Sequence, residues 1–423
     1  MLFDEIERDF MGLRGHTEPL FNYLNRSSRP SMVRIRELLE SWYSNYPQES
    51  RHELRARFRS PDDIQHKGAF FELYMHALVS RLGYRIETHP AVPAVSTRPE
   101  FLVYRKEIPL FYLEATLAAG PSEETAADKR INAVYETIDR MNSPNFFIGV
   151  NVEKSSMKAP PGRKWRGAIE RWLPKLNPDE IGAKMKSGGL ENLPTLIVEK
   201  EGWRVAFQAI PKSPQLRGKP GVRPIGLQFI PFHQCNEDEW IRNAIEEKAT
   251  KYGNLNLPYL IAINVLSIFS NEPHMIMDAL FGDEQVTSYF APGGKTHEEL
   301  TRASNGVLLG REGPQNTRVS GIVVLSDLSW GNIAKTNPVL WHNPWASRQL
   351  DSELWPFPQW TLNESKTKIV PKTGGDAGGF FRPAQGVAAR RRGKRLRIID
   401  SECPTGPGSG IFPAPAEIGL FSK

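Results

Sequence analysis

Two apolar runs that each carry a single carboxylate constrain the fold of this chain more than any other feature. Glu100 lies in one run, residues 97–104, and Glu114 lies in the other, residues 110–117. Both runs are rich in β-branched and aromatic residues and flank the charged turn 105–109, so they predict a β-hairpin. A carboxylate buried in an apolar strand is costly unless it has a partner. Two carboxylates at the same end of one hairpin therefore favour a divalent cation between them, because Mg²⁺ binds one or two carboxylates and completes its shell with water and phosphate.

A simpler interpretation places each glutamate at a strand end, where it reaches solvent or a basic side chain. Arg98, Arg105 and Lys106 are close enough in sequence to serve as partners. Because glutamates are common in strand-like runs, the hairpin alone leaves both interpretations open.

The elements around the hairpin alternate between helix and strand. Residues 68–82 have apolar side chains at helical spacing, with Gly83 placed to end the helix, and residues 84–89 alternate as a first strand. After the hairpin, residues 122–141 open with acidic side chains and continue as a helix, and residues 146–152 form a short buried strand. The predicted order is therefore helix, three strands, helix, strand.

This order, together with the positions of its acids, resembles the PD-(D/E)xK restriction-endonuclease-like superfamily over residues 62–155. Pro99-Glu100 stands at the Pro-Asp element, Glu114-Ala115-Thr116 at the (D/E)xK element, and Glu72 at the acid of the first helix. The motif is short and degenerate, so the ordered elements carry the resemblance more than the letters do. The resemblance implies an α/β fold with an αβββαβ core around a central mixed sheet.

The resemblance also implies a catalytic role for each of these side chains. Glu100 and Glu114 would bind Mg²⁺ or Mn²⁺ as the cofactor. Glu72 would assist through a second metal or a water, and Thr116 would position the nucleophilic water.

Two departures from the family pattern concern the motif residues themselves. Glu100 replaces the usual aspartate, which keeps the charge and lengthens the side chain by one methylene. Thr116 stands where the family has a lysine, whose charge stabilises the transition state. Lys67, Lys129 or Arg130 could bring a cation into the site, although each also fits a solvated helix face.

A second helix-and-strand unit occurs later in the chain. Residues 241–265 repeat, in outline, the helix, break and strand of residues 130–152. This combination is common enough for chance similarity. No paired strand carboxylates accompany the second copy, so we assign it no catalytic role.

The length of 423 residues allows two or three domains. We expect a helical N-terminal extension at 1–60 and a restriction-endonuclease-like core with an added hairpin at 61–235. A second α/β segment is expected at 236–345. Residues 346–423 are expected to form an aromatic, Pro-rich segment and a flexible basic tail, largely disordered after about residue 365.

The tail contains a run of cations without an acid at residues 390–397. Such a run binds polyanions through counterion release. The net charge of +6 also favours nucleic acid as a partner, although mildly. We therefore expect a nucleic-acid partner, with DNA as the first candidate. The expected contacts are Lys129, Arg130, Arg390, Arg391, Arg392, Lys394 and Arg395.

Several classes of protein are disfavoured by the sequence. No run of about 18 apolar residues is present, so we expect no membrane span. The acidic start lacks the pattern of a signal peptide, and Cys235 and Cys403 are far apart, so the cytoplasm is the expected compartment. Neither a phosphate-binding Gly-rich loop with Lys-Ser/Thr nor a Gly-x-Ser-x-Gly elbow occurs.

The sequence as a whole predicts a metal-dependent nuclease that hydrolyses phosphodiester bonds, with genome defence or repair as its setting. A homodimer, or a partner protein of a defence system, fits such a role. The alternative is a catalytically inactive protein that uses the same fold to bind nucleic acid or a partner protein. A third interpretation is a toxin-like or assembly scaffold whose aromatic second half contacts other proteins.

Overall fold

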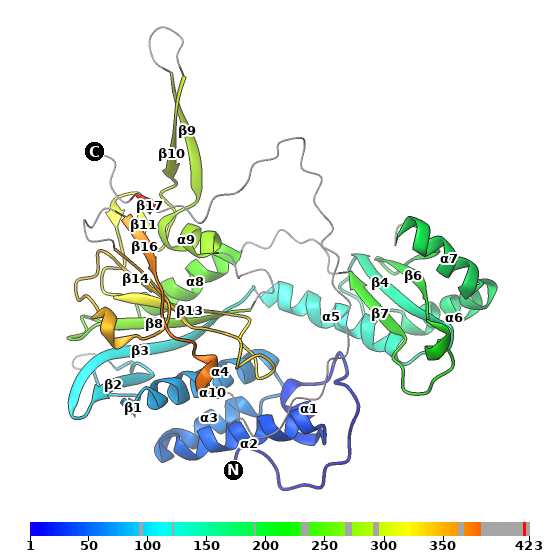
Figure 1. The fold of residues 1–423 in the computed structure, drawn as a ribbon, viewed down its shortest axis with the longest axis horizontal. Helices are drawn as coiled ribbons and strands as arrows, with labels where there is room; N and C mark the ends of the chain where they lie inside the picture. The colour runs from blue at the N-terminus through cyan, green and yellow to red at the C-terminus, as the bar shows by residue number, and fades with distance from the viewer. Residues whose placement is uncertain are drawn as a thin grey trace.

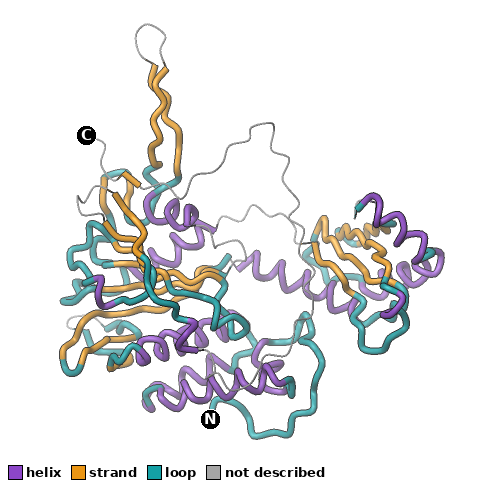
Figure 2. Tube along the Cα trace, in the orientation of Figure 1, coloured by secondary structure: helices purple, strands orange, loops and turns teal. Residues whose placement is uncertain are grey.

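A computed structural model describes the chain except for residues 93–95, 121, 190–191, 230–236, 267–272, 291–295, 363–367, 382–417 and 420–423. The fold is mixed α/β, with one large sheet in a main body and a smaller sheet in a separate lobe (Figure 1, Figure 2). No helix within the described residues is both long and apolar enough to cross a membrane.

The sheet of the main body is mixed. Its first three strands form an antiparallel meander, and the predicted hairpin is β2–β3, with Phe101 opposite Leu113. Strands β3, β8 and β13 run parallel to one another. In spatial order the described strands are β1 (Arg85–Thr88), β2 (Phe101–Arg105), β3 (Ile108–Ala118), β8 (Tyr259–Val265), β13 (Gly321–Ser326), β14 (Val339–His342), β15 (Gln359–Leu362), β16 (Lys368–Lys372) and β17 (Ile418–Gly419).

Helices cover both faces of this sheet (Figure 1). α4 (Asp63–Arg81) packs on one face, and α8 (Glu237–Ala249) and α9 (Pro273–Phe281) pack on the other. Successive side chains of a strand point to opposite faces. Because Leu113 packs in the core beneath α4, the next residue, Glu114, faces α8.

Three helices of the N-terminal region pack against the side of α4 that faces away from the sheet. They are α1 (Leu20–Arg26), α2 (Pro30–Asn45) and α3 (Arg51–Phe58). Trp42 of α2 contacts Tyr74 of α4, with ring centroids 6.0 Å apart. These helices therefore join the core beneath α4 rather than forming a separate one.

The lobe is inserted between β3 and α8. α5 (Ser122–Asp139) leads away from the main body into it (Figure 1), and α6 (Gly162–Trp172) and α7 (Pro178–Gly188) cover its sheet. The lobe has its own core, in which the fully buried Trp165 and Trp203 lie 5.9 Å apart. Its strands, in spatial order, are β5 (Thr195–Lys200), β6 (Trp203–Pro211), β4 (Phe146–Lys154) and β7 (Ile225–Phe229).

The position of the strand at residues 146–152 corrects the expected core. This strand is part of β4, which pairs with β6 and β7 of the lobe and not with β3. β8 takes that place beside β3, and α8 precedes it. The units at 130–152 and 241–265 share one pattern, and periodicity alone does not decide which of them pairs with β3. In the main sheet the order helix, three strands, helix, strand is completed by the second unit.

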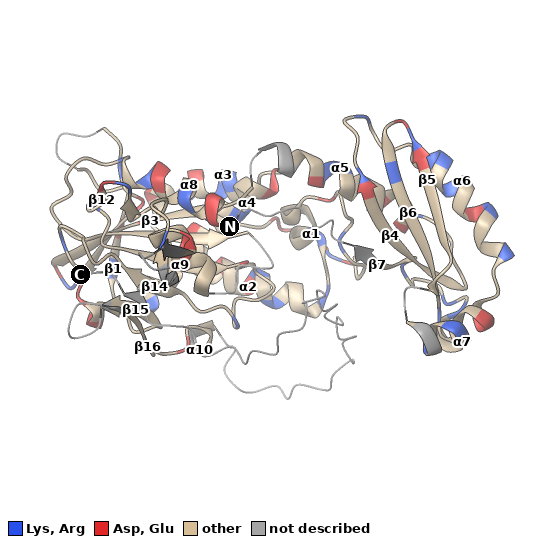
Figure 3. Ribbon diagram, turned by 90° about the horizontal axis from the view of Figure 1, so that it is seen from above, with Lys and Arg blue, Asp and Glu red and all other residues tan. Residues whose placement is uncertain are grey.

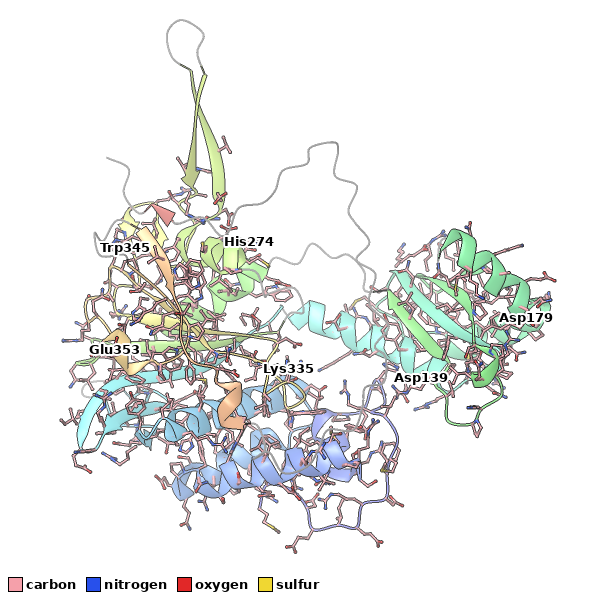
Figure 4. All side chains as sticks on the ribbon, in the orientation of Figure 1. Asp139, Asp179, His274, Lys335, Trp345 and Glu353 are labelled. Atoms are coloured by element: carbon pink, nitrogen blue, oxygen red, sulfur yellow. The ribbon has the colours of Figure 1, made fainter. Side chains whose placement is uncertain are left out.

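Contacts at the end of α5 tie the lobe to the N-terminal segment. His16 Nε2 lies 3.0 Å from Asp139 Oδ2, and Arg223 Nε lies 3.0 Å from the same oxygen. The backbone N–H of His16 also donates to Glu136, at 2.7 Å. Asp139 is labelled in Figure 4, where α5 reaches the lobe.

The expectation of disorder after about residue 365 is wrong for residues 368–381. This segment forms β16 and α10 (Gly378–Phe381). The ring centroid of Phe381 lies 5.1 Å from that of Trp42 and 5.2 Å from that of Tyr74. One buried aromatic ring thus anchors a segment whose glycine-rich composition suggested mobility. The cationic run at 390–397 lies outside the described residues.

The remaining described strands form two small hairpins. β9 (Glu284–Phe290) and β10 (Thr296–Arg302) project from the main body (Figure 1), and the short β11 (Leu309–Gly310) pairs with β12 (Gly313–Pro314).

Candidate active site

The hairpin brings Glu100 and Glu114 side by side. Glu100 Oε2 accepts a hydrogen bond from the backbone N–H of Ala115 at 2.7 Å, and Glu114 Oε2 accepts one from the N–H of Glu100 at 3.2 Å. Each carboxylate is therefore held by the backbone next to the other carboxylate. This exchange follows from the register, because Phe101 and Leu113 are opposed and each glutamate is adjacent to one of them.

Glu72 joins this pair from α4. Its side chain is 2 % exposed, and it accepts hydrogen bonds from the Tyr46 hydroxyl and from Arg57. Burial raises the pKa of Glu100 well above its ordinary value, and the charges of Glu72 and Glu114 raise it further. Glu100 therefore lies close enough to both Glu72 and Glu114 to interact with each electrostatically.

Glu114 is fully buried and is surrounded by donors from α8 and the loop after it. Lys251 Nζ lies 3.1 Å from Glu114 Oε1, and Lys248 Nζ lies 3.6 Å from the same atom. The Tyr252 hydroxyl donates to Glu114 Oε2 at 2.6 Å. Burial opposes the charge of Lys248, but the carboxylates of Glu114 and Glu247 outweigh it and raise the pKa of Lys248 above its ordinary value.

Among the described residues, none of the cations proposed from the sequence (Lys67, Lys129 and Arg130) forms an ion pair with Glu100 or Glu114. Lys129 is exposed and forms an ion pair with Asp62 at 3.5 Å, and neither it nor Arg130 bonds to Glu100 or Glu114. Thr116 is half-buried, on the same face of β3 as Glu114 and opposite Ile263 of β8.

The sequence reasoning missed Lys248, Lys251 and Tyr252, which lie in the unit to which no catalytic role was assigned. The signal that points to them is the parallel pairing of β3 with β8, because the helix before β8 must then cross the face of β3 that carries Glu114. That signal becomes available only when β8, rather than β4, is taken as the neighbour of β3.

The donor set at this site offers two carboxylates to a divalent cation. Glu100 uses only Oε2 in hydrogen bonds to described residues, which leaves Oε1 for a ligand. Both oxygens of Glu114 already accept hydrogen bonds, so Lys251 or Tyr252 must shift before Glu114 binds a cation. Among the described residues no group of three or more His, Cys, Asp and Glu side chains is arranged to hold a metal. Glu100 Oε1, together with Glu114 after such a shift, would supply the one or two protein carboxylates that Mg²⁺ takes, with water and phosphate completing its shell.

His76 lies one turn after Glu72 on α4, buried against the rings of Tyr46 and Phe101 at 4.8 and 6.0 Å. Burial lowers the pKa of His76 to about 4. In the unfolded chain a histidine ionises near pH 6.5, so the unfolded state binds an extra proton between these values and stability falls as the pH drops through this window. The free energy of unfolding of the wild-type protein should therefore fall between pH 7 and pH 4.5. His76→Phe removes this histidine, so we expect that fall to be smaller by roughly 2.5 kcal/mol in the variant, at 1.36 kcal/mol per pKa unit. Urea unfolding at both pH values measures the free energy of unfolding, and an equal fall in the wild type and the variant would contradict the prediction.

Comparison with known protein families, curated proteins and solved structures finds no match to this chain.

Proposed function

We propose that this protein is a metal-dependent nuclease that hydrolyses phosphodiester bonds at Glu100 and Glu114. The observation that carries the proposal is the convergence of these two carboxylates at the start of the β2–β3 hairpin, with Glu72 near Glu100. The charges of Glu72 and Glu114 raise the pKa of Glu100, and a cation bound at Glu100 would offset that repulsion. The arrangement of α4, three antiparallel strands and a parallel fourth strand supports a restriction-endonuclease-like core.

In the proposed reaction, a water oxygen forms a bond to phosphorus as the bridging phosphorus–oxygen bond breaks. The water loses a proton to solvent, and the departing alkoxide takes one from solvent. Glu100 and Glu114 would hold Mg²⁺ or Mn²⁺, which would supply Lewis-acid chemistry when bound. Thr116, on the same face of β3 as Glu114, orients the attacking water through its hydroxyl. Glu72 would hold a further water through a lone pair that its hydrogen bonds from Tyr46 and Arg57 leave free.

A test of this proposal is incubation of the purified protein with plasmid DNA, single-stranded DNA and RNA, in Mg²⁺, Mn²⁺ or EDTA. We expect cleavage of at least one substrate with either metal and none in EDTA. No cleavage of any substrate, or equal cleavage in EDTA, would contradict a metal-dependent nuclease.

The second candidate is a catalytically inactive protein of the same fold that binds nucleic acid or a partner protein. The donors around Glu114 favour it, since Lys251, Tyr252 and a backbone N–H already occupy the carboxylate. In such a protein the ammonium groups would replace the metal as the counter-charge. Metal binding detected by calorimetry without any cleavage would favour this candidate.

The cationic run at 390–397 is expected to strengthen nucleic-acid binding without geometric specificity. The basic helix α6 still includes one acid, Glu170 (Figure 3), whereas this run contains none. Each phosphate neutralised adds about 0.9 to the slope of log affinity against log salt on duplex DNA. Replacing Arg390, Arg391, Arg392, Lys394 and Arg395 by glutamine should therefore flatten that slope by up to about 4.5. A salt titration of binding by fluorescence anisotropy measures the slope. An identical slope in the variant would show that these five side chains do not contact phosphates.

A further inference from the structure

The proposed reaction lacks one component in the hairpin itself. Hydrolysis places negative charge on the oxygens of the phosphate, and a fixed cation aimed at those oxygens stabilises the transition state. Thr116 has a hydroxyl but no charge. The described residues nevertheless place two ammonium groups within 4 Å of Glu114, from a part of the chain distant in sequence.

Lys251 is held against Glu114 and against the segment that precedes Glu100. Its Nζ lies 3.1 Å from Glu114 Oε1, and its backbone oxygen accepts a hydrogen bond from Thr97 Oγ1 at 3.0 Å. The next residue, Tyr252, places its hydroxyl 2.6 Å from Glu114 and 3.1 Å from the backbone oxygen of Arg98. The loop after α8 is therefore held against the segment that leads into Glu100 as well as against Glu114.

Lys251 is better placed than Lys248 to contact a substrate. The side chain of Lys251 is 36 % exposed, and its one ion-pair partner among the described residues is Glu114. Lys248 is 15 % exposed, lies farther from Glu114 at 3.6 Å, and is shared with Glu247 at 3.2 Å. An ammonium group has three N–H donors. Lys251 thus keeps donors available for a phosphate oxygen, whereas the half-buried Lys248 is shared between two acids.

We propose that Lys251 is the catalytic cation of this site and replaces the charge that Thr116 lacks. This assignment rests on the proposed nuclease function. The ammonium group of Lys251 contacts a non-bridging oxygen of the scissile phosphate and offsets the charge that develops there. Lys248 and Tyr252 are positioning residues, because they hold Glu114 without facing the substrate.

The test removes the ammonium group at position 251 and places one at position 116. Lys251→Met should lower the turnover number for DNA cleavage by about 100- to 1000-fold, as expected for loss of one group that stabilises transition-state charge, with a much smaller change in KM. Adding Thr116→Lys to Lys251→Met restores an ammonium group on the same face of β3 and should recover at least about tenfold. The matched control is Thr116→Met with Lys251→Met, which has similar length and no charge and should recover nothing. Lys251→Met activity within threefold of the wild type, or equal activity in the two double variants, would overturn the assignment.

A second measurement reads the same contact without turnover. In EDTA, where no metal-dependent cleavage occurs, we expect Lys251→Met to bind a short DNA duplex with a salt slope lower by about 0.9, the contribution of one phosphate contact. The variant with both Thr116→Lys and Lys251→Met should restore the slope.

The two proposals can fail separately. If the wild-type protein cleaves nothing, the nuclease proposal fails, and the salt slope alone decides whether Lys251 contacts phosphate. A slope unchanged by Lys251→Met would refute that contact. Melting temperatures of all variants identify any that are unfolded, and Lys248→Met reports the effect of a positioning residue.

Discussion

Replacement of Glu114 by glutamine is expected to reduce the rate of DNA cleavage by at least about a thousandfold while DNA binding stays equal or becomes slightly tighter. The amide keeps the shape of the side chain and removes its charge, so the site loses a metal ligand. It also loses a source of repulsion toward the phosphate, which explains the expected gain in binding. The measurement is single-turnover cleavage of a labelled duplex in Mg²⁺, paired with anisotropy in EDTA.

The control for this variant is Glu107→Gln, the same change at a turn position that is 89 % exposed. It should cleave at the wild-type rate. Cleavage by Glu114→Gln at the wild-type rate would move catalysis away from the β2–β3 hairpin. A large fall in melting temperature is the other outcome to check, because Lys248 and Lys251 would then lie beside a neutral side chain.

Replacement of Trp165 by alanine is expected to destabilise the lobe by about 3–5 kcal/mol, the usual cost of removing a fully buried large aromatic side chain. Trp165 of α6 packs edge-on against Trp203 at 5.9 Å and against Phe207 at 6.2 Å. Because the lobe has its own core, its loss of stability should appear as a separate transition at lower denaturant concentration. Tryptophan fluorescence during urea unfolding measures it, with Arg166→Ala on the same helix as the control. A single transition shifted as a whole would show that the lobe and the main body unfold together.

The elements nearest the site were predictable because their signals are local. The hairpin follows from two β-rich runs, 97–104 and 110–117, around a charged turn, and the structure has β2–β3 there. The helix predicted at 68–82 is α4, which begins earlier because the Asp62 side chain accepts hydrogen bonds from the N–H groups of Ile64 and Gln65. The predicted pattern begins at Gly68, which lies inside the helix. A capping acid outside the apolar pattern is a weaker signal than the pattern itself.

The rest depended on pairings that local sequence does not encode. Two helix-and-strand units have the same periodicity, and only the packed sheet selects β8 over β4 as the neighbour of β3. The lysine that lies at Glu114 is 137 residues away in the chain, so no motif spacing links the two. Phe381 shows the same limit, since its burial against Trp42 and Tyr74 depends on a gap that forms only in the folded molecule.

The insertion of the lobe also sets the order in which the site is assembled during synthesis. Glu100 and Glu114 leave the ribosome well before Lys251, because the whole lobe is translated between them. At about 5–20 residues per second, the 137 residues from Glu114 to Lys251 take roughly 7 to 27 s. During that interval the nascent chain carries its carboxylates without their ammonium partners and without β8 to complete the sheet. Under the proposed mechanism, a chain arrested within the lobe is inert toward nucleic acid, and hydrolysis begins only after translation has passed the lobe.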